Sequence, residues 1–255
     1  MPEAAHVERW SRYVAEYHEA HPGITEDLLT AACDDTGRSP YDWLVEAVPA
    51  SATTVIDLAC GSMPLARRLA PRRVVGVDQS PGELSRAAAG PGWPVRGRAS
   101  ALPVADGAAG AVVCSMALML LHPLEPVLRE VARALGAGGT FAATVPVRAA
   151  TPAASPFGRV LAALGQDGEP YPEALDGPTL APRLASAGLG LRSDETTTFR
   201  RDVDGPADAE RVVRSFYAPG AGPTRVAAAV DELRDQLRAG PVAIDYRVRR
   251  LVARR

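Results

Sequence analysis

The amino-acid sequence predicts an α/β protein: a doubly wound, seven-stranded sheet with an antiparallel last strand, an N-terminal helical cap and helical lid insertions. Two observations lead to this fold class. Short β-branched runs alternate with stretches whose apolar residues recur at helical spacing, which is the pattern of βαβ units. The chain of 255 residues is also 47% hydrophobic, so it can bury a full core as one domain with appendages.

The first βα unit lies at residues 53–70. Its opening segment, TTVIDLACGS at 53–62, combines a buried strand that ends near Asp57 with a turn of small residues. Small residues let the backbone approach a ligand closely. The next strand ends in Asp78, 17 residues after Gly61. An acid at this place can accept hydrogen bonds from ribose hydroxyls.

Helices are expected ahead of the first strand. Apolar and aromatic residues predict a helix over 3–20, Thr25 is a candidate N-cap for a second, and Ser39-Pro40 opens a third. We therefore divide the chain into four parts. These are an N-terminal helical cap (1–48), a core (49–200), a helical lid insertion (201–240) and the final strand of the core (241–255).

The remaining elements follow in βα order. Ser80-Pro81-Gly82-Glu83 fits a capping box, with Ser80 as N-cap and Glu83 at N3. The clearest amphipathic helix lies at 123–135. Strands are expected at 93–97, 110–115, 140–145, 189–200 and 242–253. The segments 146–178 and 201–240 would then overhang the edge of the sheet where a ligand binds.

Five segments together resemble class I S-adenosylmethionine (SAM)-dependent methyltransferases. They are residues 53–62, residues 74–78, GRASALPVADG at 97–107, AVVCSMALMLLH at 111–122 and LGAGGT at 135–140. In the family these correspond to motif I, the acidic second-strand motif, the adenine loop, the fourth strand and the turn into the fifth strand. The resemblance implies that 49–200 is a Rossmann-like core that binds SAM and releases S-adenosylhomocysteine.

The resemblance also implies a set of cofactor-binding residues. Asp78 would hold the ribose hydroxyls, and Asp57 with the turn after it would shape the amino-acid end. The full expected set is Asp57, Ala59, Gly61, Asp78, Gln79, Ala99, Ser100, Ser115, Tyr13 and Tyr17. The two tyrosines are included because related enzymes often reach the cofactor from an N-terminal helical segment. Simple core or surface placement is the competing interpretation for each of them.

Several positions depart from the family pattern. Ala59 and Met63 stand where motif I usually has glycine, and Met63 would either narrow the methionine end of the pocket or point into the core. Arg98 stands where related enzymes often carry an acid, and a guanidinium cannot accept a hydrogen bond from the adenine amino group. These changes keep open a methyltransferase-like protein that has lost methyl transfer and only binds a ligand or catalyses another reaction.

Catalysis of methyl transfer needs alignment more than a nucleophile on the protein, because a sulfonium methyl group is already activated. An acceptor hydroxyl would still need a base. His122, which follows the fourth strand, is the first candidate, and His18 or His21 on the cap is the second. The competing interpretation of His122 is a helix-flanking residue that never meets the substrate. The three scattered cysteines form no close-spaced metal motif, so no metal site is expected.

Composition limits the partners. A net charge of −2 gives no general attraction to nucleic acid, and no apolar run approaches the length of a membrane span. The odd number of cysteines suits the cytoplasm, and basic residues that are all Arg indicate a GC-rich bacterial coding bias. We expect a small-molecule acceptor, with bacterial secondary metabolism as one setting. An RNA or protein methyltransferase is the alternative, and the sequence names neither the acceptor atom nor the oligomeric state.

Overall fold

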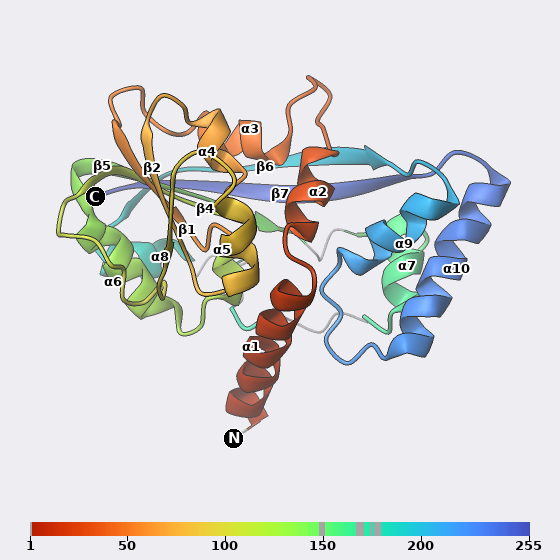
Figure 1. The fold of residues 1–255 in the computed structure, drawn as a ribbon. Helices are drawn as coiled ribbons and strands as arrows, with labels where there is room; N and C mark the ends of the chain where they lie inside the picture. Colours follow the sequence, from red (N-terminus) through yellow and green to blue (C-terminus); the bar gives the residue numbers. More distant parts are fainter. Residues whose placement is uncertain (1, 148–150, 167–170, 174, 176–179) are drawn as a thin grey trace.

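In the computed structural model of the chain, residues 2–147, 151–166, 171–173, 175 and 180–255 are described. Seven strands form one sheet in the order β3-β2-β1-β4-β5-β7-β6 (Figure 1). The pairs from β3 to β5 are parallel, and β7 is antiparallel to both of its neighbours. The strands are β1 (Thr54–Leu58), β2 (Arg73–Asp78), β3 (Trp93–Arg96), β4 (Ala109–Ser115), β5 (Leu135–Pro146), β6 (Gly190–Asp202) and β7 (Ala243–Arg254). The predicted doubly wound sheet with an antiparallel last strand is confirmed.

Helices pack on both faces of this sheet and against the far end of its β6–β7 pair. The α-helices are α1 (Pro2–Ala20), α2 (Ile24–Thr30), α3 (Pro40–Val45), α4 (Leu65–Arg68), α5 (Pro81–Ala87), α6 (Leu124–Ala134), α7 (Pro156–Ala163), α8 (Leu180–Ser186), α9 (Pro206–Arg214) and α10 (Pro223–Ala239). A short 3-10 helix, η1, spans Leu118–Leu120. The helix α7 lies inside the predicted insertion 146–178, of which residues 148–150, 167–170, 174 and 176–178 lie outside the described residues.

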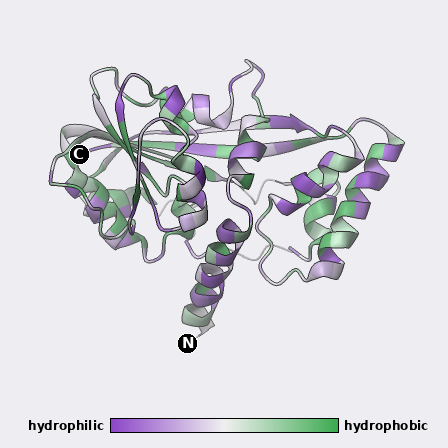
Figure 2. Ribbon diagram, in the orientation of Figure 1, coloured by the Kyte–Doolittle hydropathy of each residue, from purple (hydrophilic) through white to green (hydrophobic). Residues whose placement is uncertain are grey.

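The central strands are buried on both faces. Val55 and Val113 belong to a hydrophobic cluster with α3 and α4, whereas Ile56 and Val112 belong to a second cluster with α6 and α8. Strands that are covered on both faces need apolar residues at successive positions, which accounts for the continuous apolar run of β1. Figure 2 accordingly shows the middle of the sheet as mainly hydrophobic.

The strands β6 and β7 continue past the rest of the sheet and carry a separate group of helices. Their far end packs against α7, α9 and α10 (Figure 1). A third hydrophobic cluster forms there, and it includes Phe199 of β6, Ile244 of β7, Val160 of α7, Val212 of α9 and Leu233 of α10. Thus α7, α9 and α10 share a core that is separate from the clusters beside β1 and β4.

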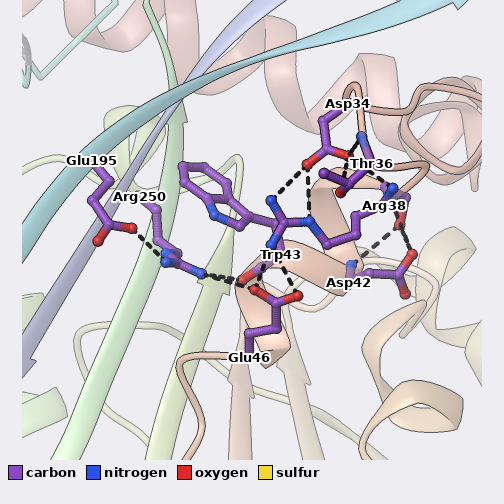
Figure 3. Close-up of polar contacts among 9 residues, drawn as sticks. Asp34, Thr36, Arg38, Asp42, Trp43, Glu46, Glu195 and Arg250 are labelled. Atoms are coloured by element: carbon purple, nitrogen blue, oxygen red, sulfur yellow. Dashed lines mark hydrogen bonds and ion pairs between the residues drawn. The ribbon is translucent and has the colours of Figure 1, made fainter.

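Arg250 of β7 ties the N-terminal segment to the sheet. Its guanidinium donates hydrogen bonds to the backbone carbonyl of Trp43 and to the Glu195 carboxylate of β6 (Figure 3). It also lies 4.4 Å from the centre of the Trp43 ring, within the range of a cation–π contact. Because Arg250 of β7 contacts both α3 and β6, it fixes the N-terminal segment against the sheet on this side.

Asp34 organises the turn that leads into α3 (Figure 3). Its buried carboxylate accepts hydrogen bonds from the Thr36 hydroxyl at 2.7 Å and from the Arg38 backbone N–H at 2.9 Å. Burial alone would raise the pKa of Asp34, but the hydrogen bonds from Thr36 and Arg38 outweigh it and lower the pKa to about 2. The charged form of Asp34 is therefore the form that the folded chain holds.

Two predicted helix starts differ from the structure. Gly23, with φ of 80°, is the N-cap of α2, so the prediction that Thr25 caps this helix is wrong. Ser80 does cap α5 by accepting the Glu83 backbone N–H, but the reciprocal half of the predicted capping box is absent. The Ser80 backbone N–H donates instead to Asp78, at 2.9 Å. The Glu83 carboxylate is thereby left to make contacts outside α5.

Element lengths differ from the prediction in two other places. The helix after β1 is a single turn, α4, rather than a run through residue 70. β5 begins at Leu135 rather than at 140, because residues 135–139, which the sequence places in a turn, extend the strand.

The Asp34 contacts predict a pH-dependent stability. A carboxylate with a folded pKa of about 2 and an unfolded pKa near 3.9 stabilises the fold above about pH 4, and this contribution is lost as the pH falls towards 2. Asp34→Asn should therefore lower the free energy of unfolding near neutral pH, and its deficit against the parent chain should shrink below about pH 4. Denaturant unfolding across this range measures the deficit.

The control for this prediction is Asp231→Asn on the exposed side of α10, where the carboxylate side chain is 72% exposed. We expect a small change there with little dependence on pH. A deficit for Asp34→Asn that stays constant from neutral pH to about pH 2 would contradict the prediction.

Candidate functional site

A cavity of about 300 Å³ lies at the carboxyl ends of β1, β2 and β4. It is lined by eight of the residues predicted to bind a cofactor, and by both predicted catalytic histidines, His18 and His122. The eight are Asp57, Ala59, Gly61, Asp78, Gln79, Ala99, Ser100 and Ser115. The structure thus brings together residues from the end of β1 to the end of β4, as a ligand site at this edge of a doubly wound sheet requires.

The turn after β1 is held by Asp78. The Asp78 carboxylate accepts the Gly61 backbone N–H at 2.8 Å and the Ser80 backbone N–H at 2.9 Å. Both Ala59 and Gly61 have φ in the left-handed region, at 52° and 51°. Ala tolerates this conformation only at some cost, so the contact with Asp78 helps to keep the turn in the form that opens it to the cavity.

The side chain of Met63 does not narrow this cavity. Met63 has φ of 60° and is 4% exposed. A Cβ atom added at Gly76 would lie 2.6 Å from the Met63 Sδ atom, and one added at Gly92 would lie 2.8 Å from its Cε atom. The thioether therefore fills space left by two glycines beside β2. Of the two interpretations of Met63, the structure supports the one in which it points into the core.

Asp57 carries an unpaired polar atom at the cavity. Its carboxyl group is 1% exposed, and the Oδ2 atom has no hydrogen-bond partner among the described residues. Burial, with a further contribution from the nearby Asp78 charge, raises the pKa of Asp57 well above its usual range. A cationic group bound beside Asp57 would satisfy this atom and favour the ionised carboxylate.

Four carboxylate side chains line the cavity, those of Glu26, Asp57, Asp78 and Glu83. Arg98 is the arginine that lines it, on a turn closed by a hydrogen bond from the Ala101 backbone N–H to the Arg98 carbonyl. The lining is therefore richer in acids than in permanent cations. Such a site suits a ligand with positive charge and hydroxyl groups, and SAM carries a sulfonium, an ammonium and a ribose.

A second cavity of about 90 Å³ lies next to the first, and its lining is mostly apolar. The two cavities share Thr25, Met116 and Tyr217, which form the boundary between them. Met116 has φ of 53°, a strained conformation for a residue with a side chain. The other residues around the second cavity are Leu28, Leu29, Met119, Pro146, Val147, Thr151, Phe157, Leu161, Tyr171, Ser215, Phe216, Tyr246 and Arg247.

The two candidate histidines have different surroundings. His122 Nδ1 lies 2.7 Å from Glu173, whose buried carboxylate also pairs with Arg183. His18 lies between two partners, with Nδ1 2.8 Å from Glu83 and Nε2 2.8 Å from the Tyr217 hydroxyl. His122 is not among the described residues that line the second cavity, whereas Tyr217 lines both cavities.

Tyr13 and Tyr17 are not among the described residues that line the larger cavity. The Tyr13 hydroxyl accepts the Ala218 backbone N–H at 2.8 Å, and the Tyr17 hydroxyl donates to the Arg214 carbonyl at 2.9 Å. Both rings pack in an aromatic cluster with Tyr217. These contacts join α1 to the segment after α9, and a cofactor contact by either tyrosine remains a prediction.

Sequence reasoning missed several lining residues, among them Glu26, Thr25, Glu83, Met116 and Tyr217. Only weak signals pointed to them. Met116 lies inside the segment that resembles the fourth strand of the family, and Glu83 is the acid of the predicted capping box. Tyr217 carries no local signal, because its role depends on contact with His18, 199 residues away.

The fold and part of the sequence match known proteins. Residues 56–143 match the family model of a methyltransferase domain. Among curated protein sequences, none matches this chain. The chain shares its fold with the YcgJ protein of Bacillus subtilis, at 16% identity and a TM-score of 0.60, covering 85% of this chain and 97% of that one.

Two further solved structures have similar folds. One is an S-adenosylmethionine-dependent methyltransferase from Mesorhizobium loti, at 19% identity and a TM-score of 0.51, covering 84% of this chain and 98% of that one. The other is the [4+2]-cyclase SpnF, at 22% identity and a TM-score of 0.56, covering 84% of this chain and 79% of that one. The family model, the sheet order and the acidic cavity agree. Residues 56–143 match a methyltransferase domain, and the chain as a whole has the fold of these solved structures.

Proposed function

We propose that this chain transfers the methyl group of SAM to a small-molecule acceptor that binds in the apolar cavity. The observation that carries this proposal is the junction at Thr25, Met116 and Tyr217, where an acidic cavity suited to SAM adjoins an apolar one. In this arrangement residues 1–48 act as the cap, 49–200 with 241–255 as the core and 201–240 as the lid.

The cofactor contacts follow from the lining of the larger cavity. Asp78 would accept hydrogen bonds from the ribose hydroxyls, and Asp57 would face the ammonium group. Gln79, Ala99 and Ser100 would surround the adenine. When bound, SAM supplies an activated methyl group, so the work of the chain is to align the acceptor and exclude water. Positioning of this kind contributes up to about 7–11 kcal/mol in well-oriented reactions.

A small acceptor is favoured over a macromolecule for two reasons. The apolar cavity is bounded by α7 and by the segment that follows α9, so it suits a compact apolar group. The net charge of −2 also supplies no general attraction to a polyanion, so we propose no nucleic-acid partner. Among the described helices none is long and apolar enough to cross a membrane. Three free thiols, Cys33, Cys60 and Cys114, favour a reducing, cytoplasmic setting.

The proposal is tested with the purified chain in two steps. Calorimetry measures the affinity for SAM and for S-adenosylhomocysteine. Tritium-labelled SAM is then offered with a panel of apolar alcohols, phenols and amines, and in parallel with RNA and with protein fractions. Transfer to members of the small-molecule panel supports the proposal. Transfer to RNA or protein alone would favour the macromolecular alternative, and SAM binding without any transfer would favour a non-methylating role.

The Asp78 contacts predict a specific loss of cofactor affinity. Asp78→Ala removes the acceptor for the ribose hydroxyls and for the Gly61 backbone N–H. It should weaken SAM binding by about 1.5–3 kcal/mol, the scale of a hydrogen bond to a charged group. Calorimetry measures this loss, and far-UV circular dichroism checks the fold. Asp231→Ala on α10 is the control, and an equal affinity in Asp78→Ala would remove Asp78 from the site.

The buried carboxyl group of Asp57 predicts proton release. Burial raises the pKa of Asp57 and so favours its protonated form, and an adjacent ammonium group would lower that pKa. SAM binding should then release a proton near neutral pH. Calorimetry in buffers of different ionisation enthalpy counts the protons released. Asp57→Asn should bind SAM without this release, and the same proton count in both proteins would contradict the assignment.

The cap and lid predict a closing motion. Water must be kept from the methyl donor, so residues 1–48 and 201–240 should become more protected from hydrogen exchange when SAM and an acceptor are both bound. Mass spectrometry of exchanged peptides measures this protection. The strand pair β1–β4 serves as the internal control, because it is already buried. Equal exchange of the two segments with and without ligands would argue against closure.

A further inference from the structure

A chain of three polar side chains reaches the boundary between the two cavities. Glu83 of α5 is 2% exposed, and one of its oxygens lies 2.8 Å from His18 Nδ1 while the other accepts the Gly23 backbone N–H at 3.0 Å. On the other side of the ring, His18 Nε2 lies 2.8 Å from the Tyr217 hydroxyl. The three residues come from α5, α1 and the segment after α9, so the fold brings them together only when the cap and lid are in place.

The direction of these hydrogen bonds follows from the chemistry of the groups. A carboxylate can only accept, so His18 Nδ1–H donates to Glu83. In the neutral imidazole the other nitrogen then accepts, and the Tyr217 O–H donates to His18 Nε2. Burial raises the pKa of Tyr217, so this hydroxyl stays protonated rather than becoming a tyrosinate.

The Tyr217 hydroxyl has one free position for a ligand. A hydroxyl has one proton to donate and two lone pairs that can accept. The proton is donated to His18, and the Thr25 side chain hydrogen-bonds to the same oxygen. One lone pair remains, on a residue that lines both cavities. This lone pair can accept a hydrogen bond from the O–H group of a bound methyl acceptor.

We propose that Tyr217, His18 and Glu83 form a proton relay and that the acceptor is methylated on oxygen, in the hydroxyl group of an apolar phenol. This inference rests on the proposed function, because it needs SAM in the larger cavity. The aromatic side chains of Phe157, Phe216 and Tyr171 around the smaller cavity favour a ring-bearing acceptor. Tyr217 contacts the acceptor, and His18 and Glu83 act through it as positioning residues.

The proton and electron balance is complete with these groups. The acceptor oxygen forms a bond to the methyl carbon, and the S–CH₃ bond breaks with its electron pair left on sulfur. The proton of the acceptor hydroxyl passes to the Tyr217 oxygen while the Tyr217 proton passes to His18 Nε2. The resulting imidazolium is stabilised by the Glu83 carboxylate, and it loses its proton to water when the product leaves. His18 is 19% exposed at its side chain, which gives water a route to the ring.

The test compares two phenols of similar size, with the full chain and tritium-labelled SAM slightly above neutral pH. 4-Methylphenol has the pKa of a tyrosine, about 10, and needs a base, whereas 4-nitrophenol is already largely ionised. Tyr217→Phe should lower kcat for 4-methylphenol by about 10²–10⁴-fold and kcat for 4-nitrophenol far less. Damage to the shape of the pocket would instead lower both alike, and equal losses would overturn the relay.

Two further variants test whether the selective loss belongs to Tyr217 or to another residue near the cavities. Tyr17→Phe removes a hydroxyl from the same aromatic cluster, one that bonds to the Arg214 carbonyl, so any loss should be equal for both phenols. His122→Ala tests the other histidine of the larger cavity. If the selective loss for 4-methylphenol appears in His122→Ala and not in Tyr217→Phe, then His122 is the base and the relay is wrong.

A second readout needs no turnover. Nitrogen-15 NMR of the His18 ring in the chain alone should show the proton on Nδ1 and an accepting Nε2. Tyr217→Phe should shift the Nε2 signal while Nδ1 keeps its proton, and Glu83→Gln should alter the proton distribution between the two nitrogens. A proton on Nε2 in the unaltered chain would overturn the proposed direction of the relay.

The outcomes for the relay and for the proposed function are separate. If the chain does not bind SAM in the calorimeter, the proposed function fails and the relay fails with it. If SAM binds and methyl reaches 4-methylaniline as readily as 4-methylphenol, or reaches neither phenol, then only the relay to oxygen is overturned. Selective transfer to the phenols with the loss in Tyr217→Phe supports the inference.

Discussion

Two neighbouring acidic side chains govern the ligand site of this protein: Asp57, which has an oxygen without a hydrogen-bond partner among the described residues, and Asp78, which is hydrogen-bonded. Asp57 and Asp78 end neighbouring parallel strands, and they share one cavity. Asp78 is satisfied by two backbone N–H groups, whereas Asp57 is left buried with an unpartnered oxygen among the described residues. An acid in that position is costly to ionise until a cation arrives. The site therefore favours a positively charged ligand before any specific contact is counted.

Much of the fold was predictable from the sequence because its signals are local. The β-branched run at Val55–Ile56 and the acid at Asp78 gave the first two strands and the ligand edge, and Ser80 capped its helix as expected. The order of βα units then predicted the sheet, since parallel strands need crossover helices.

The remaining parts of the site depend on tertiary contacts. Glu83 has the position of a capping-box acid, yet Asp78 takes the backbone N–H that it would have bound, and Glu83 turns to His18 instead. Threonine is a residue type that often caps helices, which is why the sequence predicts Thr25 as the N-cap. In the structure Gly23 is the N-cap of α2, in a left-handed conformation. Tyr217 is one of two aromatic residues in the segment 201–240, and only its contact with His18 in the folded chain distinguishes it from Phe216. The roles of these residues depend on contacts between distant segments, which form only in the folded chain.

The long β6–β7 pair has a consequence for how this protein could change over time. The helices at its far end have their own hydrophobic cluster, while the larger cavity lies at the carboxyl ends of β1, β2 and β4. Residues such as Phe216 and Tyr246 belong to that distant cluster and also line the apolar cavity. Under the proposed function, substitutions there would change acceptor choice while the turn at Gly61 keeps its geometry. On that proposal, most residues of the acceptor cavity would vary independently of the turn that holds the donor, with Thr25, Met116 and Tyr217 shared between the two cavities.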